Sequence, residues 1–330
     1  MASKPVSFWG SNGTPDNAIQ QGHRGSTDNR FISITRDIAV PPSPTGYIFT
    51  AVQTETDIEN IRQFLRQWFG RPPNSPRLDN PICERDQILL SVRYKINGGL
   101  HIAGTVRYKY TGNFNGHPIN IIDCFCIHPE WRKRGIGTYL LSALHHYTNS
   151  VGRKWSIFLK EGRVLPITQT PFYSSLYKYR RICSDIFITN VQTIGVEVAL
   201  KIIGVFKLLR PDVFIITNNQ TLNQKWRLYS VGKYWILAVI QDTYQIHPYN
   251  YGKIGFCAGV IESIGFPQSL RKDALLQITE VSEFSWMWVD TMWIDDISHG
   301  SIWNIDGPFH WYAYQWTTSI KPSRDYCIMI

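Results

Sequence analysis

The residues best suited to chemistry lie in the segment Asn120–Thr138, which reads NIIDCFCIHPEWRKRGIGT. An apolar strand leads there into a basic turn with two glycines, at the expected start of a helix. Glycines let backbone N–H groups converge on an anion, and the helix dipole adds positive potential. The pattern R-x-x-G-x-G therefore predicts a pyrophosphate site, although a solvated basic helix start is the alternative that the turn alone leaves open. Its residues are Arg132, Lys133, Arg134, Gly135, Ile136, Gly137 and Thr138.

Other ligand-binding motifs do not fit this chain. The turn is not a P-loop, because G-x-x-x-x-G-K-[ST] does not occur, and Leu140 replaces the third glycine of the dinucleotide-binding fingerprint. The cysteines at 83, 124, 126, 183, 257 and 327 form no C-x-x-C pair. We therefore expect no metal site and no disulfide framework, and reduced thiols in a cytoplasmic protein.

Composition limits the class of protein. Of 330 residues, 14% are aromatic and 18% charged, which is typical of a globular chain with a large core. The net charge of +9 predicts an anionic partner, which could be nucleic acid, a membrane surface or a phosphate-bearing cofactor. The longest apolar run, Tyr234–Ile240, is too short to cross a bilayer, so we expect no integral membrane protein.

Hydrophobic periodicity predicts an α+β fold. The pattern predicts a strand at 46–52 and a helix at 56–70, followed by three strands in an antiparallel meander. A helix from Gly137, a strand at 153–162 and a short aromatic helix at 170–181 come next. His145 and His146 are expected on the surface of the helix from Gly137. From Ile186 the chain is β-rich again, with a helix over PQSLRKDALLQIT and a closing strand in FHWYAYQW. We predict an extended arm at 1–45 and two related domains at 46–185 and 186–330.

The order of these elements resembles the GNAT acyltransferase superfamily, in which the glycine turn holds the pyrophosphate of an acyl-CoA. The segments DCFCIHPEWRKRGIGTYLL and FLKEGRVLPITQTPFY are similar to the protein N-myristoyltransferase motifs N-F-L-C-V-H-K-x-L-R-S-K-R-L-A-P and Y-T-A-G-V-V-L-P. SFWG, TGYIFTAV, FSWMWVDTM and NIDGPFHWYAYQW resemble further stretches of that family. Departures are the turn Gly135-Ile136-Gly137, Asp123 and Cys124 in place of Asn and Phe, and Lys160 in place of Thr.

The resemblance implies two GNAT-like halves, the first binding acyl-CoA and the second contributing the peptide site and the C-terminal carboxylate. It implies transfer of a myristoyl group from myristoyl-CoA to the N-terminal glycine of proteins or peptides. A GNAT acetyltransferase acting on a protein N-terminus or a small amine is the alternative, which the intact R-x-x-G-x-G favours. A protein that binds single-stranded nucleic acid would instead show steep salt dependence, and we expect no nucleic acid as a partner.

The same resemblance assigns roles to residues. Backbone N–H groups of Cys124 and Phe125 would stabilise the oxyanion, and the main-chain carboxylate of Ile330 would be the base. Acyl-CoA would contact Phe8, Trp9, Phe125, Cys126, Ile127 and the turn at 132–138, and the peptide would contact Tyr173, Asp306 and Gly307.

Overall fold

The computed structural model describes residues 31–34, 45–52, 54–69, 77–78, 87–161, 163–165, 171–182, 186–217, 224–247, 251–290, 304–317 and 326–329. The helices are α2 (Glu55–Trp68), α3 (Ile136–Ser150), α4 (Val196–Leu209), α5 (Gln268–Thr279) and the 3₁₀ turn η1 (Pro129–Trp131). The strands of the N-terminal half are β1 (Ile32–Ser33), β2 (Tyr47–Ala51), β3 (Arg77–Leu78), β4 (Gln87–Ile96), β5 (Gly99–Phe114), β6 (His117–Ile127), β7 (Ser156–Glu161) and β8 (Tyr173–Arg181). Those of the C-terminal half are β9 (Val191–Ile194), β10 (Phe214–Thr217), β11 (Gln224–Val231), β12 (Tyr234–Ile246), β13 (Lys253–Glu262), β14 (Trp286–Asp290), β15 (Asn304–Tyr314), β16 (Trp316–Thr317) and β17 (Tyr326–Met329).

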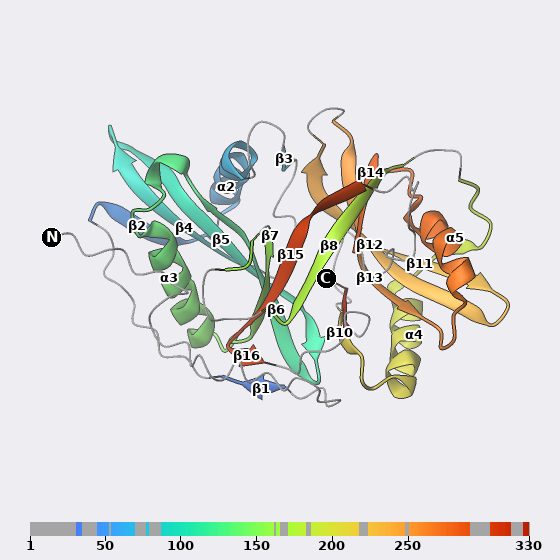
Figure 1. The fold of residues 1–330 in the computed structure, drawn as a ribbon. Helices are drawn as coiled ribbons and strands as arrows, with labels where there is room; N and C mark the ends of the chain where they lie inside the picture. Colours follow the sequence, from blue (N-terminus) through green and yellow to red (C-terminus); the bar gives the residue numbers. More distant parts are fainter. Residues whose placement is uncertain are drawn as a thin grey trace.

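One fifteen-stranded sheet crosses the whole molecule (Figure 1). Its main order is β17-β10-β5-β6-β7-β15-β8-β14-β13-β12-β11-β9; β2 joins through β4, which pairs with β5, and β3 pairs with β12. β1 and β16 form a separate two-stranded sheet. The α+β fold class that the sequence predicts is confirmed.

The N-terminal half contains the predicted meander β4-β5-β6, which β2 extends by pairing with β4, and one helix covers each face. The side chain of Thr54 accepts a hydrogen bond from the backbone of Asp57 and caps α2. α2 buries Ile61 and Leu65 on the face that carries Cys124 and Cys126. On the other face, the core around Leu90, Val106 and Tyr108 packs against α3, which contributes the side chains Ile136, Tyr139, Leu140, Leu141 and Leu144.

The C-terminal half repeats this arrangement around β9, β11, β12 and β13. α4 buries Ala199, Ile203 and Phe206 against one face of the strands. α5 buries Ala274, Leu275 and Ile278 in a separate core that reaches the central strands. The helix predicted over PQSLRKDALLQIT is thus confirmed as α5.

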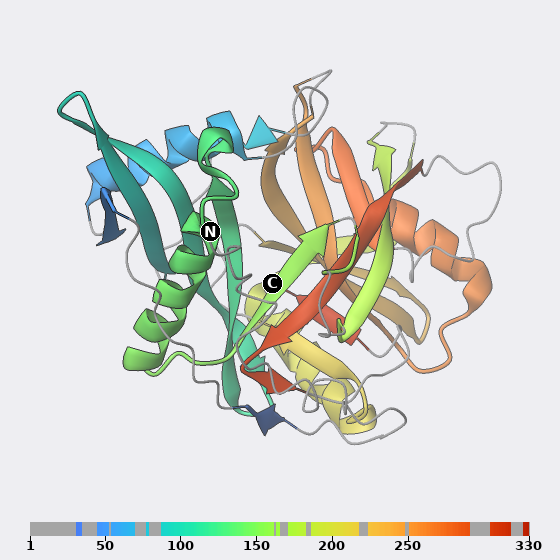
Figure 2. The ribbon, with the colours of Figure 1, turned by 60° about the vertical axis from the view of Figure 1, so that its left-hand side comes forward.

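The two halves exchange strands at the centre of the sheet (Figures 1 and 2). β15 comes late in the chain, yet it pairs with β7 on one side and β8 on the other. β8 in turn pairs with β14 of the C-terminal half. Because each half supplies a strand to the other, we expect them to fold together. The predicted domain boundaries remain a prediction.

Two local predictions are wrong. Residues 173–181 form strand β8 rather than a short helix. Among its described side chains, Arg180 is buried and the neighbouring Arg181 is exposed, as expected for the two faces of a strand. Helix α4 was not expected, since its sequence VEVALKIIGVFKLL is apolar almost throughout and shows no clear period. Within the described residues, no helix is long and apolar enough to span a membrane.

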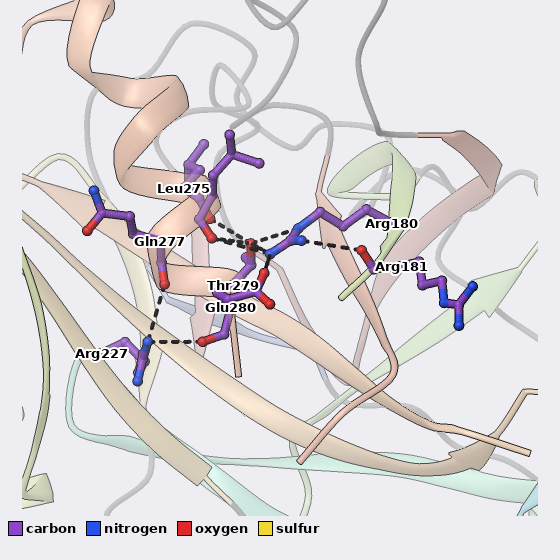
Figure 3. A network of polar contacts seen from close by, with 8 residues as sticks. Arg180, Arg181, Arg227, Leu275, Gln277, Thr279 and Glu280 are labelled. Atoms are coloured by element: carbon purple, nitrogen blue, oxygen red, sulfur yellow. Dashed lines mark hydrogen bonds and ion pairs between the residues drawn. The ribbon is translucent and has the colours of Figure 1, made fainter. Parts of the chain in front are cut away.

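A buried ionic network ties β8 to the end of α5 (Figure 3). Arg180 is fully buried, and its Nη2 lies 2.7 Å from Oε2 of Glu280 and 3.1 Å from Oγ1 of Thr279. Arg227 of β11 donates from Nη2 to the carbonyl oxygens of Gln277 and Glu280, each at 3.2 Å. These bonds satisfy carbonyl groups at the C-terminus of α5, which the helix itself leaves without partners.

Candidate active site

Strand β6 carries a bulge at Cys124 and Phe125. Asp123 pairs with Arg107 and Cys126 pairs with Thr105, so two residues of β6 lie opposite one residue of β5. The backbone of Cys124 has a φ of 49°, a left-handed value that is uncommon for a residue with a side chain. Because a bulge interrupts the regular ladder, its backbone N–H groups can be directed at a ligand.

The pairing of β6 with β7 ends immediately before this bulge. Asn120, Ile121 and Ile122 pair in parallel with β7, and β7 then continues to Glu161 beside β15. Beyond Ile122, β6 has no register partner in β7 within the described residues. Among the described strands, none therefore pairs with the backbone of Asp123–Ile127 on that side.

The basic turn between η1 and α3 follows within a few residues. Lys133 and Gly135 have φ values of 61° and 81°, and Arg132, Lys133 and Arg134 are exposed. Nε of Arg132 donates to the carbonyl oxygen of Ile127 at 3.1 Å, and the guanidinium of Arg134 lies 4.6 Å from the ring centroid of Trp131. These contacts fix two of the cations beside the helix start.

The start of α3 has the features of an anion site. Gly135 offers no capping side chain, and the first turn contains no acidic residue. The first N–H groups of a helix have no partner within the helix, and they carry the positive end of its dipole. Together with three exposed cations, this environment suits the diphosphate of a coenzyme A.

The bulge and the helix start are brought together. The side chains of Phe125 and Ile127 both lie over Gly137, where an added Cβ would come 3.8 Å from Cγ1 of Ile127. These contacts bring the predicted coenzyme A residues Phe125 and Ile127 next to those at the start of α3, whereas the side chain of Ile136 is buried in the core between α3 and the sheet. The side chain of Cys126 packs against α2 on the opposite face of the sheet, so only the backbone of Cys126 is available on the side of α3.

The cysteines of β6 are poor nucleophiles. Burial raises the pKa of Cys124 and of Cys126 to about 12, so both thiols are neutral at pH 7. His128 accepts a hydrogen bond at Nδ1 from the backbone of Glu130, and its ring contacts Trp68 of α2. The site is thus suited to catalysis by backbone N–H groups rather than by a thiolate.

The remaining predicted residues lie elsewhere or outside the described residues. Tyr173 is 6% exposed in the central core, and its hydroxyl donates to Oδ2 of Asp290 at 2.5 Å. Asp306 and Gly307 lie in β15 at an irregularity of its pairing with β8, and only their backbone is described. Phe8, Trp9 and Ile330 fall outside the described residues. Their roles stay predictions.

The last described strand, β17, forms one end of the main strand order of the large sheet. β17 runs parallel to β10, with Met329 beside Thr217, and Thr217 in turn pairs with Asn113 of β5. The strand also lies close to β13 (Figure 1). The chain that leads to Ile330 is therefore part of the central sheet.

Sequence reasoning missed two polar contacts near the site. Arg107 binds the carboxylate of Asp123 from the neighbouring strand, and only its position between buried apolar residues of β5 hinted at an inward role. His145, which was expected on the surface, is 3% exposed, and its Nδ1 lies 2.8 Å from the hydroxyl of Tyr314. His146 is exposed as expected.

Comparison with known proteins identifies the fold. Residues 58–159, which run from α2 to β7, match the model of the Acetyltransferase (GNAT) family. This segment is similar to a GNAT-family domain. It contains the bulge, the basic turn and the start of α3.

Solved structures extend the similarity in fold beyond this segment, to nearly the whole chain. Saccharomyces cerevisiae N-myristoyltransferase with bound myristoyl-CoA has a TM-score of 0.63 at 10% identity, over 97% of this chain and 99% of that chain. The same yeast enzyme with bound myristoyl-CoA and inhibitors has a TM-score of 0.61 at 11% identity, over 89% and 88% of the chains. At this identity the similarity shows the fold, which has two GNAT-like halves. No curated protein sequence is significantly similar to the chain. Within the described residues, no group of His, Cys, Asp and Glu side chains could hold a metal ion.

Proposed function

We propose that the protein transfers a myristoyl group from myristoyl-CoA to the N-terminal glycine amine of proteins or peptides. The observation that carries this proposal is the extent of the fold similarity to yeast N-myristoyltransferase, which covers 97% of the chain. A single GNAT domain would account only for the N-terminal half. The GNAT-family match, the bulge in β6 and the uncapped start of α3 support acyl-CoA as the co-substrate.

In the proposed reaction the amine nitrogen attacks the thioester carbonyl carbon directly. A C–N bond forms, the carbonyl oxygen becomes an oxyanion, and collapse of this intermediate breaks the C–S bond. Coenzyme A leaves as thiolate and takes up the proton that the new amide nitrogen loses. Backbone N–H groups at Cys124 and Phe125 would stabilise the oxyanion, because fixed donors need no reorganisation as charge develops. The turn at 132–138 would hold the diphosphate, and the acyl-CoA site requires no metal.

The attacking amine must first lose a proton. In water, an α-carboxyl has a pKa of about 3.5 and an α-amino group one of about 7.8, so transfer between them costs about 6 kcal/mol. Burial raises the pKa of a carboxyl and lowers that of an ammonium, which narrows this difference. We assign the base to the main-chain carboxylate of Ile330, and the pairing of β17 with β10 in the large sheet, close to β13, supports the assignment.

A second function is favoured by a specific observation. The family model that matches residues 58–159 is that of acetyltransferases, and the turn keeps the pattern R-x-x-G-x-G. An acetyltransferase with a protein N-terminus or a small amine as acceptor therefore remains the alternative.

A competition experiment separates the two functions. The protein is incubated with equimolar acetyl-CoA and myristoyl-CoA and with a peptide that begins with glycine, and the products are identified by mass. We expect the myristoylated peptide, and no product from a matched peptide that begins with alanine. Predominant acetylation would support the alternative, and transfer of neither group would reject both functions.

A further inference from the structure

Arg107 and Asp123 form a two-pronged ion pair across β5 and β6, at the base of the bulge. Nε of Arg107 donates to Oδ1 of Asp123 at 2.7 Å, and Nη2 donates to Oδ2 at 2.6 Å. The side chains are 7% and 29% exposed. Such a fork fixes both the position and the plane of the carboxylate, which a single hydrogen bond would not do.

The next residue, Cys124, has the left-handed φ of 49°. Left-handed backbone is disfavoured for a residue with a Cβ, and it persists where surrounding contacts determine it. Asp123 is the last residue of β6 in register before the bulge, and Cys126 is the first after it. Fixing the Asp123 side chain therefore fixes one end of a two-residue loop whose other end is held by the ladder.

The charge of Asp123 is maintained in this environment. Burial by itself would raise the pKa of the carboxyl, but attraction and hydrogen bonds from Arg107, with a further attraction from Lys109, hold the pKa below its ordinary value. The fork thus persists throughout the neutral range. An asparagine could not replace it, because its amide offers one acceptor oxygen, and its NH₂ group would face an Arg donor.

We propose that Arg107 and Asp123 are positioning residues for acyl transfer: their ion pair holds Cys124 in the left-handed conformation and so directs the N–H groups of Cys124 and Phe125 at the thioester carbonyl. This inference rests on the proposed function, since it assigns those N–H groups to the reacting carbonyl. Neither side chain needs to touch the substrate.

The chain offers a matched control for a purely structural ion pair. Arg271 of α5 binds Glu262 of β13 in the same two-pronged way, with Nε–Oε2 at 3.0 Å and Nη2–Oε1 at 2.8 Å. The side chains are 8% and 23% exposed, close to those of Arg107 and Asp123. This pair lies in the C-terminal half, and Glu262 is in register with Ile236 of β12.

The experiment compares Asp123→Asn and Arg107→Lys with Glu262→Gln and Arg271→Lys in the full chain. Three quantities are measured: the Kd of myristoyl-CoA, the infrared frequency of its ¹³C-labelled thioester carbonyl when bound, and the single-turnover rate with a glycine peptide. For the first two variants we expect a rate about 10- to 100-fold lower, a Kd unchanged within about twofold, and a carbonyl frequency shifted towards that of the free thioester. The control variants should keep the rate and the frequency of the wild type.

Several results would overturn the inference. The first is a wild-type transfer rate and carbonyl frequency in Asp123→Asn and Arg107→Lys. The second is an equal loss of transfer rate in the control variants. The third is failure of both Asp123→Asn and Arg107→Lys to fold, because the ion pair would then be a requirement of the fold. If only one of these two variants folds, it carries the test. If the wild type binds myristoyl-CoA but transfers nothing, the proposed function fails, while the carbonyl frequency still tests the ion pair. If it binds no acyl-CoA, both fail.

Discussion

The ring of Phe125 lies against Gly137, so that a Cβ added to this glycine would come 3.2 Å from Cζ of the ring. The contact joins the bulge of β6 to the first turn of α3. It connects the segment whose backbone N–H groups are proposed for the oxyanion with the helix start proposed for the diphosphate. A side chain at position 137 would therefore disturb both ends of the proposed acyl-CoA site.

Substitution Gly137→Ala should weaken binding of acyl-CoA without destabilising the fold. Alanine gains up to about 1 kcal/mol in a helix relative to glycine. The ring of Phe125 is 41% exposed, so it can move aside, but it would then encroach on the helix start. We expect the Kd of myristoyl-CoA, measured by calorimetry, to rise about 5- to 10-fold, which corresponds to about 1.0 to 1.4 kcal/mol of lost binding energy.

Gly204→Ala in α4 is the control for this effect, because no described residue lies within 4 Å of a Cβ added to Gly204. It should change the Tm in the same direction and leave the Kd unaltered. An unchanged Kd in Gly137→Ala would contradict the placement of the acyl-CoA.

The buried thiols of Cys124, Cys126 and Cys257 should be unreactive. They should also make the free energy of unfolding decrease at alkaline pH. Burial raises the pKa of Cys124, Cys126 and Cys257 to about 12. In the unfolded chain a thiol ionises at about pH 8.5, so the folded state binds more protons above that pH. The free energy of unfolding is therefore fully retained below about pH 8.5 and decreases from there to about pH 12.

Denaturant titrations between pH 7 and pH 10 test this dependence, and Cys257→Ala should show a shallower decrease than the wild type. Alkylation of the native protein at pH 8 should spare these three cysteines until the chain is unfolded. Rapid alkylation of Cys126 in the folded protein would contradict this expectation and would support a mechanism in which a cysteine thiolate is the nucleophile.

Loss of the buried charge at Glu280 should be among the more damaging substitutions in the C-terminal half. Glu280→Gln leaves Arg180, which is fully buried, without its counter-ion (Figure 3). Breaking a buried ion pair in this way costs about 3 to 5 kcal/mol in the free energy of unfolding. The comparison is Glu283→Gln, whose ion pair with Lys225 is more than 40% exposed on both sides and should contribute less than about 1 kcal/mol. Equal effects in urea titrations would show that Arg180 finds another partner.

Extending the chain beyond Ile330 should abolish transfer while sparing acyl-CoA binding. Three added residues would move the main-chain carboxylate away from the position that the proposed mechanism requires. We expect turnover to fall by at least about 100-fold, the usual contribution of a general base, with an unchanged Kd for myristoyl-CoA. The same three residues placed before Met1 are the control. Undiminished turnover in the extended chain would exclude this role of the C-terminus.

Much of the first half could be predicted from the sequence, because its signals are local. Alternating apolar residues predict β4, β5 and β6, and the glycine turn predicts the start of α3. β8 and α4 were missed, since Tyr and Leu suit both strand and helix, and an apolar helix has no visible period. In these two elements the tertiary environment decides the structure.

The bulge geometry could not be predicted from the residues. Cys124 adopts a left-handed conformation without being a glycine or an asparagine, so no residue type indicates it. Arg107 and Asp123 meet only because the register of β5 and β6 places them opposite each other. The exchange of β8 and β15 between the halves also depends on pairing between distant segments, which local patterns do not contain.

The central claim is that the N–H groups of the β6 bulge and of the first turn of α3 hold an acyl-CoA. The most direct test is the amide NMR spectrum of the protein on titration with a thioether analogue of myristoyl-CoA, which cannot transfer its acyl chain. We predict that the largest shifts occur at Cys124, Phe125 and residues 136–138. Shifts confined to other parts of the chain, such as β11 and α4, or the absence of any shift, would contradict the account.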